Sequence, residues 1–156
     1  YFYINEEYFI VTLVISFFAL SDLFDGAMAR ISEEGSSQWG GFLDSTIDRV
    51  TDSAILIAIL IPLTASNDAL TPVALTTLVT GLLIPYIRAK AESFNIQCSV
   101  GIAERTERLI ILLTAIGFHG LGIPYALAIG LWLLATLGVI TVVQRVRTVF
   151  VGLHSS

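Results

Sequence analysis

Long apolar segments dominate this chain, and they constrain its fold more than any other feature. Of the 156 residues, 55% are hydrophobic and 13% are charged, and the mean hydropathy is +0.83. An apolar helix of about 20 residues is long enough to cross the hydrocarbon core of a bilayer. Apolar runs that approach this length occupy 8–24, 47–64, 70–87, 109–118 and 124–143. The run at 109–118 is short, and it becomes a plausible span only if its helix begins near Glu104. The sequence therefore predicts an all-α, polytopic membrane helix bundle with five spans, organised as one transmembrane domain over residues 1–156.

The basic residues lie on one side of this predicted bundle. All eight fall in or beside alternate connections between the spans: Arg30, Arg49, Arg88, Lys90, Arg105, Arg108, Arg145 and Arg147. The opposite segments, 1–7, 65–68 and 119–123, contain no Lys or Arg. Because loops rich in Lys and Arg stay in the cytoplasm, the basic side is predicted to be the cytoplasmic face of a multi-pass cell-membrane protein.

Four aspartates at the cytoplasmic ends of two predicted spans form the most specific chemical pattern. Asp22 and Asp25 are three residues apart, and Asp44 and Asp48 are four apart, so each pair shares one face of a helix. Ionisable residues beside membrane segments are costly and indicate function. Carboxylates that face one another need cations between them, and such oxygen ligands suit Mg²⁺ or Mn²⁺. The alternative is two unrelated acidic helix ends.

The spacing resembles the signature of the CDP-alcohol phosphotransferases, D-x2-D-G-x2-A-R followed by G-x3-D-x3-D. The matching positions are Asp22, Asp25, Gly26, Ala29, Arg30, Gly40, Asp44 and Asp48. The resemblance implies a fold of six helices, with one upstream of the residues shown, and an active site at the cytoplasmic membrane face. It also implies two Mg²⁺ ions, replaceable by Mn²⁺, with the four aspartates as ligands and Asp48 as the general base.

The same resemblance implies the reaction and the nucleotide site. A hydroxyl would attack the lipid-side phosphorus of a CDP-linked lipid such as CDP-diacylglycerol, and CMP would depart. The residues implied to bind the CDP-lipid are Asp22, Asp25, Gly26, Ala29, Arg30 and Ser37, with Ser36 as the alternative to Ser37. Asp52 lies one turn beyond Asp48. We expect its carboxylate to bond to residues that surround the site rather than to bind metal directly.

Three basic clusters are predicted at the same membrane depth as the aspartates. They contain Arg88 and Lys90, Arg105 and Arg108, and Arg145. Because arginine suits bidentate recognition of phosphate, a convergent set favours an acceptor alcohol that carries its own phosphate. The alternative is that these residues anchor the helices at lipid headgroups, which we expect of Arg49 and Arg147.

These segments also resemble the actinobacterial phosphatidylinositol phosphate synthases over about residues 21–147. That resemblance implies inositol 1-phosphate as the acceptor, held by Arg88, Lys90, Arg105 and Arg145, while Arg108 is expected to pair with Glu104. Glycerol 3-phosphate is the alternative acceptor, and a divalent-cation carrier is the alternative class of protein. A homodimer is also predicted, and small residues in the third and fifth spans are weak support for its interface: Thr76, Thr77, Gly81, Ala128 and Gly130.

Overall fold

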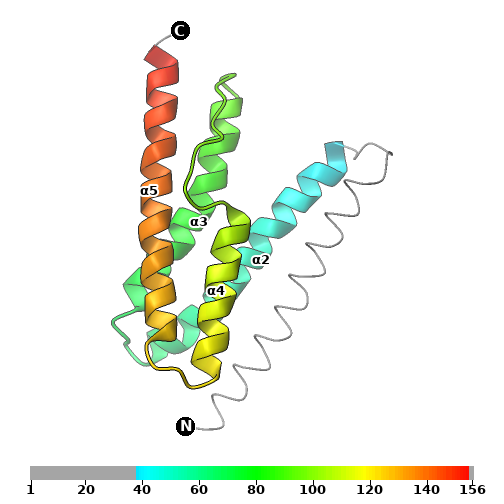
Figure 1. The fold of residues 1–156 in the computed structure, drawn as a ribbon. Helices are drawn as coiled ribbons and strands as arrows, with labels where there is room; N and C mark the ends of the chain where they lie inside the picture. Colours follow the sequence, from blue (N-terminus) through cyan, green and yellow to red (C-terminus); the bar gives the residue numbers. More distant parts are fainter. Residues whose placement is uncertain (1–37, 155–156) are drawn as a thin grey trace.

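The computed structural model describes residues 38–154, and this part of the chain is all helical (Figure 1). Its helices are α2 (Gln38–Ala65), α3 (Thr71–Glu92), α4 (Arg105–Gly120) and α5 (Ala126–His154). The all-α prediction is therefore confirmed for the described residues. Helix α4 begins at Arg105, as the short apolar run at 109–118 required. The predicted span at 8–24 lies outside the described residues, so the number of five spans stays a prediction.

Two of these helices have the length and composition of membrane spans. Helix α3 has 22 residues and α5 has 29, and each contains an 18-residue stretch of high mean hydropathy with at most two charged residues. At a rise of 1.5 Å per residue, α3 is about 33 Å long, close to the thickness of a bilayer's hydrocarbon core. Many large apolar side chains on these helices are exposed, such as Leu75, Val79, Trp132 and Val143. This outward-facing apolar surface fits a lipid environment.

Helix α2 packs along only half of its length. Its buried side chains begin at Ile55 and recur at Leu56, Ile59, Leu60 and Leu63, which form one helical face. These residues join a core with α3, α4 and α5. The residues from Gln38 to Ala54 contribute no buried side chain, and this half of α2 diverges from α3 and α5 (Figure 1).

Small residues bring α5 close to its neighbours inside the bundle. A Cβ added at Gly130 would collide with Ala115 on α4, and one at Gly138 would collide with Thr80 on α3. Thr77 is buried, and its hydroxyl lies 3.0 Å from the carbonyl oxygen of Val73 in its own helix. Gly130 and Thr77 therefore serve packing within one chain, and the idea that they form a dimer face is wrong. The homodimer itself stays a prediction.

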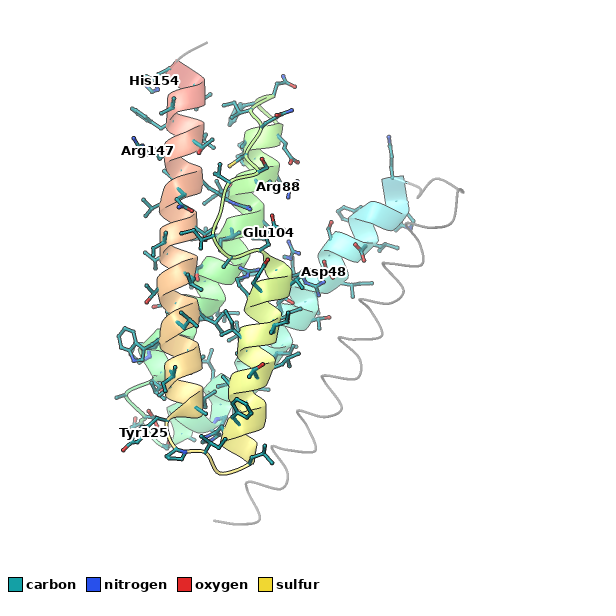
Figure 2. All side chains as sticks on the ribbon, viewed as in Figure 1. Asp48, Arg88, Glu104, Tyr125, Arg147 and His154 are labelled. Atoms are coloured by element: carbon teal, nitrogen blue, oxygen red, sulfur yellow. The ribbon has the colours of Figure 1, made fainter. Side chains whose placement is uncertain are left out.

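The connections divide between the two ends of the bundle. The α2–α3 turn and the α4–α5 turn lie at one end, together with Tyr125 (Figure 2). Arg88, Arg147 and His154 lie toward the other end. There the segment 93–104 turns back from the end of α3 to reach the start of α4 (Figure 1). Arg88 and Arg147, two of the basic residues that were assigned to one membrane side, thus share one half of the described structure.

Cysteines at the two ends of α3 will test which half faces the cytoplasm. We expect Ala69→Cys to react with a membrane-impermeant maleimide in intact cells, because positions lacking nearby Lys and Arg are expected outside. Phe94→Cys should react only after the cells are permeabilised. Cys98 is 1% exposed, so the unmodified chain is the background control. Labelling of Phe94→Cys but not Ala69→Cys in intact cells would invert the orientation.

Candidate active site

A basic cavity of about 810 Å³ lies between α2, α3 and α4. Figure 2 shows Asp48 of α2 near Glu104 at the start of α4, with Arg88 of α3 above them. The charged side chains that line the cavity are Arg49, Arg88, Glu92, Glu104, Arg105, Arg108 and Arg145. Five arginines against two glutamates leave an excess of three positive charges in this lining. Such a cavity favours an anionic occupant.

Asp48 lies beside this cavity and contacts two of its arginines. Its carboxylate oxygens lie 2.7 Å from Arg105 Nη1 and 3.4 Å from Arg49 Nη2. The Asp48 side chain is 13% exposed, whereas Asp44, one turn earlier on α2, is exposed. Residues 38–154 contain no group of three or more His, Cys, Asp or Glu placed to hold a metal ion. The other predicted donors to the metal and the CDP-lipid lie outside the described residues: Asp22, Asp25, Gly26, Ala29, Arg30 and Ser37.

Asp52 extends the contact between α2 and α4 by one helical turn. Its Oδ1 lies 3.3 Å from Arg105 Nε, and its Oδ2 lies 3.9 Å from Arg108 Nη2. Arg108 was expected to pair with Glu104, but the structure pairs it with Asp52 instead. The reason is that Arg108 lies three residues after Arg105 on the face of α4 that meets α2. Asp52 thus bonds to the arginines of the cavity, consistent with the indirect role expected for it.

Arg145 is a buried arginine that ties three parts of the fold together. It is 5% exposed, its Nη1 donates to the Ile84 carbonyl of α3 at 2.6 Å, and its Nε donates to the Val100 carbonyl at 2.9 Å. The segment before α4 can approach α5 because residue 101 is glycine. A Cβ at Gly101 would lie 2.8 Å from Thr141 Cγ2. Arg145 therefore both lines the cavity and fixes the segment that forms its wall.

The two basic residues at the end of α3 behave differently from each other. Arg88 lines the cavity and pairs with Glu92 at 3.0 Å, and both side chains are more than half exposed. An ion pair this exposed contributes little stability. Lys90 is not among the described residues lining the cavity, and its Nζ lies 4.7 Å from the centre of the Phe94 ring. Of the four predicted acceptor residues, the structure brings Arg88, Arg105 and Arg145 to the cavity.

The structure adds Arg49 and Arg108 to the candidate site. Arg49 was expected to be a headgroup anchor, but it lines the cavity and contacts Asp48. Its position directly after an aspartate of the motif was the available signal. For Arg108, the signal was its spacing of three residues from Arg105, which places both on one face of α4. Arg147, the other expected anchor, is exposed and is not among the described lining residues.

Comparison with known proteins shows the family of this chain. The sequence matches the CDP-alcohol phosphatidyltransferase family over residues 1–151. It is 43% identical to the phosphatidylinositol phosphate synthase of Streptomyces avermitilis, over 95% of this chain and 64% of that protein. It is also 43% identical to the archaetidylinositol phosphate synthase of Methanothermobacter thermautotrophicus, over 80% of this chain and 61% of that protein. The chain thus spans less than two thirds of the length of these relatives.

Solved structures lead to the same family. The chain is similar to the Mycobacterium tuberculosis phosphatidylinositol phosphate synthase with CDP-DAG bound, with a TM-score of 0.82 and 40% identity over 96% of this chain and 76% of that one. A second structure of that protein, in complex with manganese and citrate, has the same TM-score and identity over 96% of this chain and 73% of that one. The family match covers nearly the whole sequence, and the aspartate motif lies within it. This chain belongs to the CDP-alcohol phosphatidyltransferase family.

Proposed function

We propose that this chain transfers the phosphatidyl group of CDP-diacylglycerol to a hydroxyl of myo-inositol 1-phosphate, forming phosphatidylinositol phosphate and releasing CMP. The observation that carries the proposal is the contact of 2.7 Å between Asp48 and Arg105 beside a cavity with excess positive charge. A candidate proton acceptor and a candidate phosphate ligand are therefore neighbours. Relatives 43% identical to the chain are named as synthases of inositol phosphate lipids.

The arginines of the cavity would bind the phosphate of the acceptor. Arg88, Arg105 and Arg145 come from three different helices and all line the cavity. Guanidinium groups form short, charge-assisted hydrogen bonds to phosphate, often two at a time. Lys90 stays in the proposal as a further ligand at the end of α3. An acceptor phosphate bound at Arg105 would bring the hydroxyls of the same molecule near Asp48.

The aspartates would hold the metal ions and remove the proton of the acceptor. Asp22, Asp25, Asp44 and Asp48 would form an all-carboxylate donor set, whose chemistry suits two Mg²⁺ ions or Mn²⁺. When bound, such ions neutralise the diphosphate and stabilise the charge of the leaving CMP. Asp48 accepts the proton of the attacking hydroxyl, whose oxygen bonds to the lipid-side phosphorus as the bond to CMP breaks. Gly26, Ala29, Arg30 and Ser37 would hold the CDP-lipid.

The proposed location follows from the lipid substrate and the helices. Helices α3 and α5 would cross the cell membrane, and the cavity would open at its cytoplasmic face, where a soluble sugar phosphate can enter. The whole chain would form one transmembrane domain that works as a homodimer. The outward-facing apolar side chains of α3 and α5 support placement in a bilayer.

Replacing Arg105 tests the acceptor site. Losing a charge-assisted phosphate contact costs about 1.5–3 kcal/mol, or about 10- to 150-fold in affinity. We therefore expect Arg105→Gln to raise the KM for inositol 1-phosphate by this factor and to leave the KM for CDP-diacylglycerol nearly unchanged. Arg147→Gln is the matched control, because Arg147 is exposed and is not among the described lining residues. If Arg105→Gln raises the KM values of both substrates equally, the assignment of Arg105 to the acceptor site is refuted.

A further inference from the structure

Asp52 contacts two of the arginines that line the cavity, Arg105 and Arg108. On α2 it lies four residues after Asp48, so the two carboxylates share one helical face. On α4, Arg105 and Arg108 share the face that meets them. Arg105 contacts both carboxylates, at 2.7 Å from Asp48 and 3.3 Å from Asp52, and Arg108 contacts Asp52 at 3.9 Å. Asp52 therefore forms ion pairs with both guanidinium groups.

The side chain of Asp52 is more buried than that of Arg105 and less buried than that of Arg108. Asp52 is not among the described lining residues of the large cavity, and its side chain is 20% exposed. It instead lines a chamber of about 40 Å³ together with Arg108, Gly81, Thr77 and the side chains of four leucines. Arg108 lines both spaces. Its buried Nη1 has no hydrogen-bond partner in the described structure. Among the ion pairs of the described residues, the guanidinium of Arg108 pairs with Asp52.

We propose that Asp52 is a positioning residue for acceptor recognition: it orients Arg105 and Arg108 so that both face the phosphate of the acceptor. This inference rests on the proposed function of the cavity. Without the charge of Asp52, Arg108 loses its carboxylate partner and Arg105 keeps only Asp48, so the two guanidinium groups repel each other more strongly and sample more rotamers. Binding of the acceptor must then also order the two arginine side chains, and the conformational entropy lost in doing so weakens acceptor affinity. In the proposed function the CDP-lipid is held by residues of the aspartate motif and not by these two arginines, so we expect its binding to stay unchanged.

The packing of α2 makes this role separable from folding. The buried apolar residues of α2 begin at Ile55 and continue toward Leu63. Changing Asp52 to Asn keeps the volume of the side chain and leaves that apolar face intact. An amide removes the negative charge while it retains a carbonyl oxygen that accepts a hydrogen bond. The substitution therefore alters the orientation and charge of the arginines more than the packing of the helices.

The test compares substrate KM values for Asp52→Asn and Asp52→Glu, measured on purified protein with CMP release as the readout. Asp52→Asn should raise the KM for inositol 1-phosphate by about tenfold or more, and the KM for CDP-diacylglycerol should change less than twofold. Asp52→Glu retains the charge and should give an acceptor KM between those of Asp52→Asn and the unmodified chain. Glu107→Gln is the matched control, because Glu107 is an exposed carboxylate of α4 that is not among the described residues lining either space.

A double-mutant cycle separates positioning from general destabilisation. If Asp52 acts through Arg108, the combination of Asp52→Asn and Arg108→Gln should raise the acceptor KM by much less than the product of the two single effects. Multiplicative effects, or equal increases in the KM values of both substrates, overturn the proposal. If Asp52→Asn does not fold, Asp52→Glu alone must raise the acceptor KM, and an unchanged value overturns the proposal. If the unmodified chain does not use inositol 1-phosphate, both this role and the proposed function fail. If the unmodified chain uses inositol 1-phosphate but the Asp52 variants do not behave as predicted, only the role of Asp52 is refuted.

Discussion

Asp48→Asn is expected to lower the turnover number by about 10²- to 10⁴-fold, which is the usual contribution of a positioned general base. The amide has nearly the same shape as the carboxylate, but it cannot take a proton from the acceptor hydroxyl. Asp48 lies 2.7 Å from Arg105, so the proposed base is placed where an acceptor phosphate would be held. Binding of CDP-diacylglycerol should be largely retained, because three other aspartates of the motif remain.

The measurement for Asp48→Asn combines kinetics with binding. Turnover is followed by CMP release, and binding by the increase in the unfolding midpoint that CDP-diacylglycerol causes in detergent. Asp68→Asn is the control, because Asp68 is exposed in the turn between α2 and α3, where its Oδ1 accepts a hydrogen bond from the Leu70 amide at 2.8 Å. Turnover like that of the unmodified chain in Asp48→Asn would eliminate Asp48 as the base.

Apolar runs located the helices but not their ends. The run at 47–64 lies within α2, and all but the first residue of the run at 70–87 lies within α3, yet α2 begins at Gln38 and α3 continues to Glu92. Helix α5 likewise continues to His154, beyond the predicted end of its span at residue 143. Hydropathy detects only the part of a helix that matches the lipid core, whereas backbone hydrogen bonding continues into the polar ends. Most of the charged residues that line the cavity lie outside the apolar runs: Arg88, Glu92, Glu104, Arg105, Arg108 and Arg145.

Spacing along one helix predicted neighbours within that helix, but it did not predict partners across the bundle. The pair of Asp44 and Asp48 and the place of Asp52 one turn later follow directly from helical periodicity. The partner of Arg108 depends on how α2 crosses α4, and no local pattern encodes that crossing. The bonds of Arg145 to the carbonyls of Ile84 and Val100 join residues far apart in the sequence. Contacts of this kind require the tertiary structure.

The second large effect concerns the choice of acceptor by the unmodified chain. Inositol 1-phosphate offers the cavity a phosphate dianion, whereas free inositol offers only neutral hydroxyls. If at least two arginines each contribute about 1.5–3 kcal/mol to phosphate binding, kcat/KM should be about 100-fold or more lower for free inositol. Glycerol 3-phosphate carries the phosphate but lacks the ring, so it tests whether the cavity recognises more than charge. We expect it to support slower turnover than inositol 1-phosphate.

The most direct test of the account is release of CMP from CDP-diacylglycerol by membranes that contain this chain, with Mg²⁺ and one acceptor at a time. Membranes from the same cells without the chain provide the background. The account predicts rapid CMP release and a phosphatidylinositol phosphate product with inositol 1-phosphate, slower release with glycerol 3-phosphate and background release with free inositol. Faster turnover with glycerol 3-phosphate would contradict the assigned acceptor. Background release with every acceptor would contradict the proposed phosphatidyl transfer.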